Sequence, residues 1–159
     1  MPEYRGRLRG AGRVALLVSQ YNERVTTRLL DGARACCRAA AVDESAIDVV
    51  WVPGAFELGG AAAALAASGR FAAIVALGCV VRGDTPHFQF VAGEAARSLA
   101  DVAVRYRMPV GFGVLTTDSM DQALARAGGD AGNKGYEAAE AALRLADLLA
   151  QIAEGHAST

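Results

Sequence analysis

The sequence predicts an α/β fold with three layers, in which a four-stranded, mainly parallel sheet lies between helices. Two observations predict this class. Short runs rich in Val, Ile and Leu alternate along the chain with longer alanine-rich stretches, and the apolar residues of those stretches recur with a helical period. The chain has 159 residues, the length of one ordinary domain. We therefore expect one domain at residues 14–152, an arm at 1–13 and a frayed tail at 153–159.

Four apolar runs have the length and composition of buried strands. They lie at residues 14–19, 47–52, 72–81 and 110–116. A parallel sheet covered on both faces has continuous apolar strands of this kind, so the four runs predict one small sheet.

The stretches between these runs have the spacing of amphipathic helices. The first helix is expected to have Arg24, Arg28, Arg34 and Arg38 outside and to bury Val25, Leu29, Ala33, Cys36 and Ala40. Further helices are expected at 61–67, 86–107, 120–127 and 136–152. The last of these is expected to have an inner stripe formed by Ala138, Ala141, Leu145, Leu148 and Ile152.

Composition excludes several classes of protein. Sixteen basic and seventeen acidic residues give a net charge of −1, so no overall field favours nucleic acid or anionic lipid. The longest apolar run, residues 71–81, is much shorter than the ~20 residues of a membrane helix. The first residues do not resemble a secretion signal, so we expect a cytoplasmic protein.

Three cysteines without metal-type spacing predict small buried side chains at Cys36, Cys37 and Cys79.

The arm at 1–13 has no periodic pattern and contains Arg5, Arg7, Arg9 and Arg13 among glycines. We expect a solvated arm or an edge strand, the latter added to the sheet of a neighbouring chain. A nucleic-acid-binding arm is the alternative, although such arms usually contain more aromatic residues than Tyr4.

Ligands of open parallel sheets bind beyond the carboxyl ends of the strands, so the turns there are the candidate site. Aromatic and polar residues occur in all four turns: Tyr21 in the first, Ala55, Phe56 and Glu57 in the second, Asp84, Thr85 and His87 in the third, and Phe112 near the fourth. Tyr21 and Phe56 are alternatively core aromatics, and Glu57 a residue that favours a helix start. Because all these residues are expected at one edge of the sheet, they favour a site for a planar ligand held between aromatic rings.

The third turn predicts an anion site. Thr85 followed by Pro86 is typical of a helix start, with the threonine as N-cap. The free N–H groups and the dipole there suit a phosphate. The same dipole disfavours a protonated His87, so we expect a largely neutral imidazole that can take or give a proton. The alternative is a well-capped helix with an incidental histidine.

A second cluster, residues 126–135, has glycines between Arg126 and Lys134, the only lysine of the chain. A guanidinium and an ammonium both bind phosphate, and glycines allow a backbone to approach an anion. The cluster has neither the Walker spacing nor a GxGxxG pattern, so nucleotide motifs are absent. Considered alone, the segment is alternatively a loop that connects two helices.

Together these motifs resemble those of the 6,7-dimethyl-8-ribityllumazine synthase family, also called the riboflavin synthase beta-chain family. The resemblance covers residues 14–149 and is most specific at residues 52–57, 78–88, 109–114 and 128–135. It implies a flavodoxin-like fold. It also implies condensation of 5-amino-6-(D-ribitylamino)uracil with 3,4-dihydroxy-2-butanone 4-phosphate, without metal or organic cofactor, to give the lumazine, phosphate and water.

The resemblance also implies roles for individual residues. His87 corresponds to the proton-transfer residue of the family. The pyrimidine and its ribityl chain would be held by Tyr21, Ala55, Phe56, Glu57, Cys79, Val80, Val81 and Phe112. The phosphate would be held by Asp84, Thr85 and Arg126, with Arg126 supplied by a neighbouring subunit or at the subunit boundary, and Lys134 lies at a family lysine close to that site.

Two residues depart from the family pattern. Tyr21 stands where members commonly have phenylalanine or tryptophan, which keeps a stacking face and adds a hydroxyl. Asp130 stands where many members have lysine, so the positive potential of the 126–135 segment is expected to be weaker.

The resemblance further implies self-association. Family members form pentamers, and we expect a shell of sixty subunits, with a pentamer or a decamer as the alternative and riboflavin synthase as the candidate partner. Two other classes remain: a flavin-binding storage shell, which would need neither His87 nor Arg126, and a flavodoxin-like electron carrier, which would be yellow and redox-active.

Overall fold

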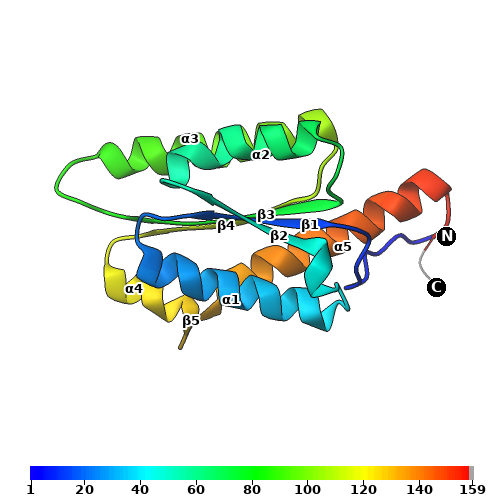
Figure 1. Ribbon diagram of the computed structural model, residues 1–159, viewed down its shortest axis with the longest axis horizontal. Helices are drawn as coiled ribbons and strands as arrows, with labels where there is room; N and C mark the ends of the chain where they lie inside the picture. The colour runs from blue at the N-terminus through cyan, green and yellow to red at the C-terminus, as the bar shows by residue number, and fades with distance from the viewer. Residues whose placement is uncertain (158–159) are drawn as a thin grey trace.

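The computed structural model describes residues 1–157 and has the predicted α/β architecture. Four parallel strands form the central sheet in the order β2-β1-β3-β4 (Figure 1). Their bounds are Val14–Ser19 (β1), Ile47–Val52 (β2), Ala73–Val81 (β3) and Val110–Thr117 (β4). The strand predictions are therefore confirmed to within one residue at each end.

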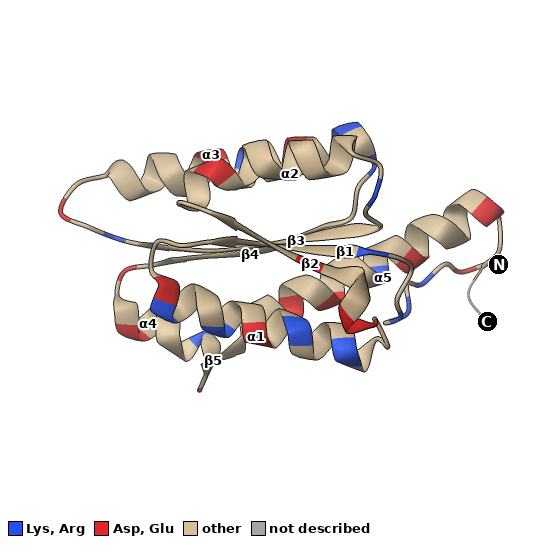
Figure 2. Ribbon diagram, viewed as in Figure 1, with Lys and Arg blue, Asp and Glu red and all other residues tan. Residues whose placement is uncertain are grey.

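Helices cover both faces of the sheet. α2 (Leu58–Ala67) and α3 (His87–Tyr106) lie on one face, and α1 (Glu23–Ala39), α4 (Met120–Ala125) and α5 (Lys134–Glu154) lie on the other (Figure 1). Two short 3₁₀ helices, Glu44–Ala46 and Ala55–Glu57, lie on either side of β2. Charged residues are frequent in α1, whereas α2 has none (Figure 2). Among the described residues, no helix combines the length and the apolar character needed to cross a membrane.

The core has two halves, one on each side of the sheet. β1 is fully buried, and its successive side chains point to opposite faces of the sheet. Leu16 belongs to the α1/α5 half of the core and Leu17 to the α2/α3 half. At about 25 cal/mol per Å² of buried apolar surface, such burial is the main source of stability. The five residues predicted for the inner face of α1 are all buried.

The inner face of α5 differs from the prediction. Leu145 and Ile152 are 36% and 56% exposed, and Ala141 is also exposed. The buried stripe contains Ala138, Ala139, Ala142, Leu143 and Ala146. Small residues of α5 pack closely on β4: an added Cβ on Gly111 would collide with the Ala138 carbonyl oxygen, and one on Gly113 would lie 3.1 Å from the Ala138 Cβ.

Other element ends also differ. α4 ends at Ala125 rather than at residue 127, and the predicted 126–135 loop contains a small antiparallel hairpin of β5 (Ala127–Gly129) and β6 (Gly132–Asn133). α2 begins three residues earlier than expected, and α5 extends to Glu154, where Gly155 (φ 71°) ends it. Of the predicted tail at 153–159, residues 158–159 lie outside the described residues.

The arm at residues 1–13 forms no strand in this chain. It lies against α5, where Asp147 accepts hydrogen bonds from the backbone N–H of Arg7 (2.8 Å) and from its Nε (3.2 Å). Arg9 pairs with the same carboxylate at 3.5 Å. The arm is thus held by ion pairs and hydrogen bonds rather than freely solvated, while pairing with a neighbouring sheet stays a prediction.

Candidate active site

The first two turns at the carboxyl edge of the sheet are joined through their backbones. The N–H groups of Gln20 and Tyr21 donate to the carbonyls of Val52 (2.8 Å) and Pro53 (2.9 Å). The Tyr21 ring lies against Gly54, where an added Cβ would be 2.6 Å from the ring carbon Cδ2. Gly54 therefore allows the ring to lie on the second turn, with 65% of Tyr21 exposed.

Asn22 joins the first turn to the end of β3. Its backbone is left-handed (φ 61°, ψ 45°), and its Nδ2 donates to the carbonyl of Cys79 at 2.9 Å. Asparagine tolerates this conformation better than most residues, so it can form the sharp turn into α1. Asn22 is not among the predicted site residues; its position between a strand end and a helix start is the signal in the sequence that indicates it.

These turns surround one open hollow of about 390 Å³, which is lined by Tyr21, Gly54, Ala55, Phe56, Glu57, His87 and Val91. A smaller hollow of about 170 Å³ shares four of these residues and adds Asn22, Cys79, Val80 and Val81. Residues from the first three turns, separated by up to 66 positions between Tyr21 and His87, therefore meet here. Gly54 and Val91 also line the hollow and were not among the predicted site residues.

α3 begins at His87, the first helical residue. The helix start differs slightly from the prediction, because Pro86 (φ −71°, ψ 7°) and not Thr85 occupies the N-cap position. The backbone N–H of His87 still donates to Thr85 Oγ1, over a long 3.4 Å. The loop before it is braced by Arg82, whose guanidinium lies 5.3 Å from the centre of the Phe88 ring and 3.6 Å from Asp118.

The predicted phosphate residues fall into two groups. Asp84 and Thr85 are exposed in the loop beside His87. Arg126 and Lys134 flank the hairpin, where the N–H of Lys134 donates to the carbonyl of Arg126 at 2.8 Å. Ala127, next to Arg126, is buried in the α1/α5 half of the core, so this pair lies across the sheet from α3. Within one chain, the structure does not bring Arg126 and Lys134 into the His87 hollow.

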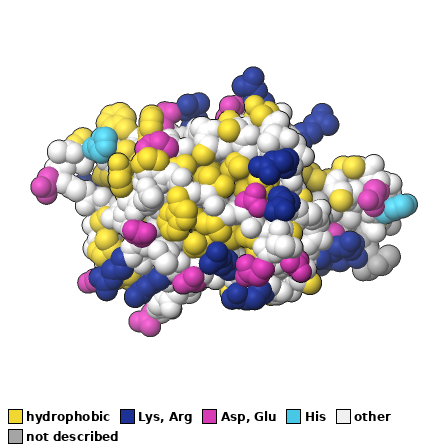
Figure 3. Space-filling view, viewed as in Figure 1, with side chains coloured by type: hydrophobic (Ala, Val, Ile, Leu, Met, Phe, Trp, Pro, Cys, Tyr) yellow, Lys and Arg dark blue, Asp and Glu magenta, His cyan; other side chains and the backbone are white. Residues whose placement is uncertain are grey.

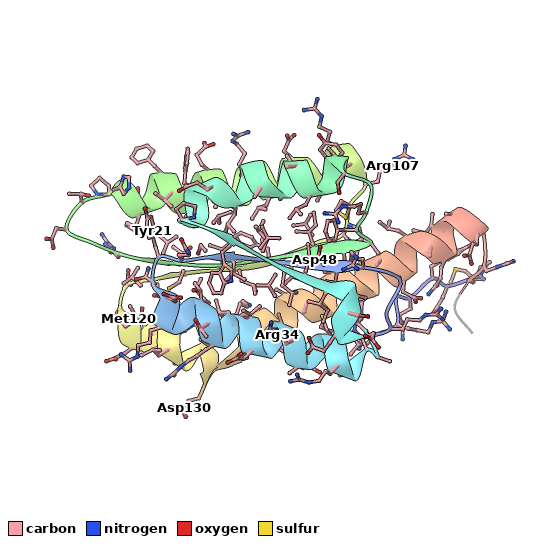
Figure 4. All side chains as sticks on the ribbon, in the orientation of Figure 1. Tyr21, Arg34, Asp48, Arg107, Met120 and Asp130 are labelled. Atoms are coloured by element: carbon pink, nitrogen blue, oxygen red, sulfur yellow. The ribbon has the colours of Figure 1, made fainter. Side chains whose placement is uncertain are left out.

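Asp130 lies at the tip of the hairpin, on the side of the sheet away from Tyr21 (Figure 4). Phe112 is also separate from the hollow. It is 46% exposed on β4 and lines an apolar groove of about 310 Å³ together with Val110 and α3 residues Ala96, Leu99, Ala100 and Ala103.

The three cysteines are free and buried, as predicted. Burial raises the pKa of Cys79, the one that lines the smaller hollow, to about 11. Its thiol is therefore protonated near neutral pH and is not a thiolate nucleophile. Within residues 1–157 no group of three or more His, Cys, Asp or Glu side chains could hold a metal ion.

An aromatic-lined hollow at the carboxyl edge of a parallel sheet, with a histidine at the start of an adjacent long helix, defines an α/β protein built to act on a small molecule. Comparison with known families gives the particular one. A sequence model of the 6,7-dimethyl-8-ribityllumazine synthase family matches residues 11–150, and the chain belongs to this family. Its activity is that of a transferase of riboflavin biosynthesis, which forms 6,7-dimethyl-8-ribityllumazine.

Proposed function

We propose that the hollow beside His87 binds 5-amino-6-(D-ribitylamino)uracil and that His87 transfers protons during its condensation with 3,4-dihydroxy-2-butanone 4-phosphate. The observation that carries this proposal is the meeting of Tyr21, Phe56, Glu57 and His87 around one hollow. A planar heterocycle needs an aromatic face, its ribityl chain needs polar partners, and the reacting amine needs a proton acceptor nearby.

The pyrimidine stacks on the exposed ring of Tyr21, and Phe56 and Ala55 cover its other side. The Glu57 carboxylate accepts hydrogen bonds from ribityl hydroxyls. Cys79, Val80 and Val81 contribute the end of β3 as the floor of the site.

The butanone phosphate lies at the start of α3, beside Asp84 and Thr85. The first N–H groups of this 20-residue helix lack partners within the helix, and its dipole favours an anion there. Arg126, with Lys134 beside it, closes this phosphate site from a neighbouring subunit. The distance of Arg126 from the hollow within one chain supports a site shared between subunits.

The reaction follows from these positions. The 5-amino group attacks the ketone and forms an imine with loss of one water, and elimination of phosphate then leaves a carbonyl on the neighbouring carbon. The ribitylamino nitrogen adds to this carbonyl and closes the second ring with loss of a second water. His87 accepts and returns the protons that these steps release. The amine is already a nucleophile and phosphate is a good leaving group, so the reaction proceeds without a metal or an organic cofactor, and positioning supplies most of the rate.

We further propose that the enzyme is cytoplasmic and assembles into pentamers and then into a shell of sixty subunits, with a pentamer or decamer as the alternative. Exposed apolar residues support association: Phe90, Val104 and Phe112 are 70%, 82% and 46% exposed. Hydrophobic side chains also lie exposed over the edge strand β2 (Figure 3). Riboflavin synthase, which uses the product, is the candidate partner.

The experiment that tests the proposal mixes both substrates with purified protein and follows the fluorescence of the lumazine. We expect product to form above the uncatalysed rate only when both substrates and protein are present, with phosphate released in equal amount. A protein that binds flavin tightly but forms no lumazine above the uncatalysed rate would contradict it.

A further inference from the structure

Asn133, the last residue of β6, uses both ends of its side-chain amide. Its Oδ1 accepts from the backbone N–H groups of Gly135 (2.8 Å) and Tyr136 (3.1 Å), which caps α5. Its Nδ2 donates to the carbonyl of Arg28 on α1, at 3.0 Å and 105 positions away in sequence. One side chain therefore caps one helix and ties it to another.

Two glycines make this contact close. A methyl group on Gly32 of α1 would collide with the Asn133 amide, and one on Gly135 would collide with the carbonyl of Leu29. The hairpin and the start of α5 are thus seated on α1 where both elements present a glycine. A larger residue at Gly135 requires the start of α5 to move away from the α1 backbone, and one at Gly32 displaces the Asn133 side chain.

The same contact holds the backbone of Arg126. Asn133 pairs with Ala127 across the β5–β6 hairpin, and the N–H of the next residue, Lys134, donates to the Arg126 carbonyl at 2.8 Å. Arg126 Nη1 in turn donates to the carbonyl of Gln122 at 3.0 Å. A shift of Asn133 relative to α1 would therefore displace Arg126.

We propose that Asn133, seated against Gly32, is a positioning residue that fixes Arg126 for binding the phosphate of the butanone substrate. This inference rests on the proposed function of Arg126. Asn133 does not touch the substrate; it sets where the guanidinium lies. The two parallel N–H groups of a guanidinium bind phosphate well only in the correct orientation. In enzyme active sites, misplacement of a group by about 1 Å lowers the rate by up to ~10²-fold.

Two substitutions separate this role from helix capping. In Asn133→Ser the hydroxyl still caps α5 but is too short to reach the Arg28 carbonyl. In Gly32→Ala the asparagine is intact and is pushed away from α1. Alanine is the better residue in a helix interior by about 1 kcal/mol, so helix propensity does not explain a loss. The matched control is Gly60→Ala on α2, where an added Cβ has no atom within 4 Å.

We expect both variants to raise the KM for butanone phosphate about tenfold, as for one lost neutral hydrogen bond. The inhibition constant of inorganic phosphate should rise by a similar factor. The KM for the pyrimidine and kcat should stay within about twofold, and Gly60→Ala should match the wild type.

Repeating each substitution in an Arg126→Ala background completes the test. If Asn133 acts through Arg126, the rise in KM disappears there, because the guanidinium that it positions is gone. An equal rise in both backgrounds, equal effects on both substrates or an unchanged phosphate KM would overturn the inference. Circular dichroism checks folding, and Gly32→Ala decides alone if Asn133→Ser does not fold. A wild-type protein that forms no lumazine would overturn the proposed function instead.

Discussion

His87 is the residue whose role is simplest to isolate. Its substitution by alanine removes the proposed proton carrier and leaves the amine nucleophile, the phosphate leaving group and the hollow in place. We therefore expect kcat to fall about 10²-fold, the low end of the ~10²–10⁴-fold range for lost acid–base catalysis. Steady-state formation of the lumazine measures it. The control is His156→Ala, at the other histidine, which lies just beyond the end of α5. Equal activity of both variants would exclude the role of His87.

Arg126 is expected to act on one substrate only. Arg126→Ala should raise the KM for butanone phosphate about 10- to 100-fold, because hydrogen bonds to charged groups contribute about 1.5–3 kcal/mol. The KM for the pyrimidine should change little. Arg126→Lys should have an intermediate KM for butanone phosphate, since lysine keeps the positive charge but cannot donate two parallel hydrogen bonds. Arg38→Ala, an exposed arginine at the far end of α1, is the control, and wild-type kinetics of Arg126→Ala would refute the phosphate assignment.

Among elements, the strands could be predicted from sequence almost to the residue, because continuous apolar runs between polar turns have few other solutions. The inner face of α5 could not be predicted in this way. Hydropathy favours Leu145 and Ile152 for the core, whereas the residues that pack on Gly111 and Gly113 are Ala138 and Ala142. The hairpin after Arg126 was also missed, since its turn depends on positive φ at Gly128 (100°) and Gly132 (83°), which leaves little trace in a hydropathy pattern.

The candidate site shows the same division. The turns that contain Tyr21, Phe56 and His87 could be predicted to converge, because parallel strands end at one edge. The contacts that depend on how distant segments pack together could not be predicted. Gly54 supports the Tyr21 ring and Asn22 bonds to Cys79, and neither contact has a sequence signature of its own. The position of Arg126 across the sheet likewise depends on how the hairpin docks on α1.

The N-terminal arm gives a prediction at the scale of elements. Burial would raise the pKa of Asp147, whose side chain is 6% exposed, but hydrogen bonds from the Arg7 N–H, Gln151 and the Arg7 guanidinium outweigh it and lower the pKa. The stabilisation is therefore complete above the unfolded pKa of about 3.9 and is lost as the pH falls through the lower folded value.

Asp147→Asn removes this ionisable group. We expect it to reduce the free energy of unfolding at pH 7 by about 1–3 kcal/mol and to flatten the loss of stability below about pH 5. Urea unfolding between pH 7 and pH 3 measures both effects. Asp31→Asn, an exposed position on α1, should behave as the wild type. Parallel pH curves for Asp147→Asn and the wild type would mean that the carboxylate does not hold the arm.

At the scale of the whole molecule, the single chain leaves an apolar groove open between α3 and β4. Such a surface favours association, and Ala103→Glu would place a charge in it at a cost of several kcal/mol if another chain covers it. We expect light scattering to give a pentamer or a multiple of it for the wild type and smaller species for the variant. Ser68→Glu, exposed at the end of α2, is the control. An active wild-type monomer would contradict the assembly.

A shared site has a sharper consequence, because two inactive variants can then complement each other. If each site takes His87 from one subunit and Arg126 from its neighbour, His87→Ala and Arg126→Ala chains assembled at random in equal amounts restore about a quarter of the sites. Each parent oligomer has none. The two variants are unfolded together, reassembled and assayed for lumazine at a butanone phosphate concentration below the KM of Arg126→Ala. A mixture no more active than its parents would place both residues within one chain, against their separation across the sheet.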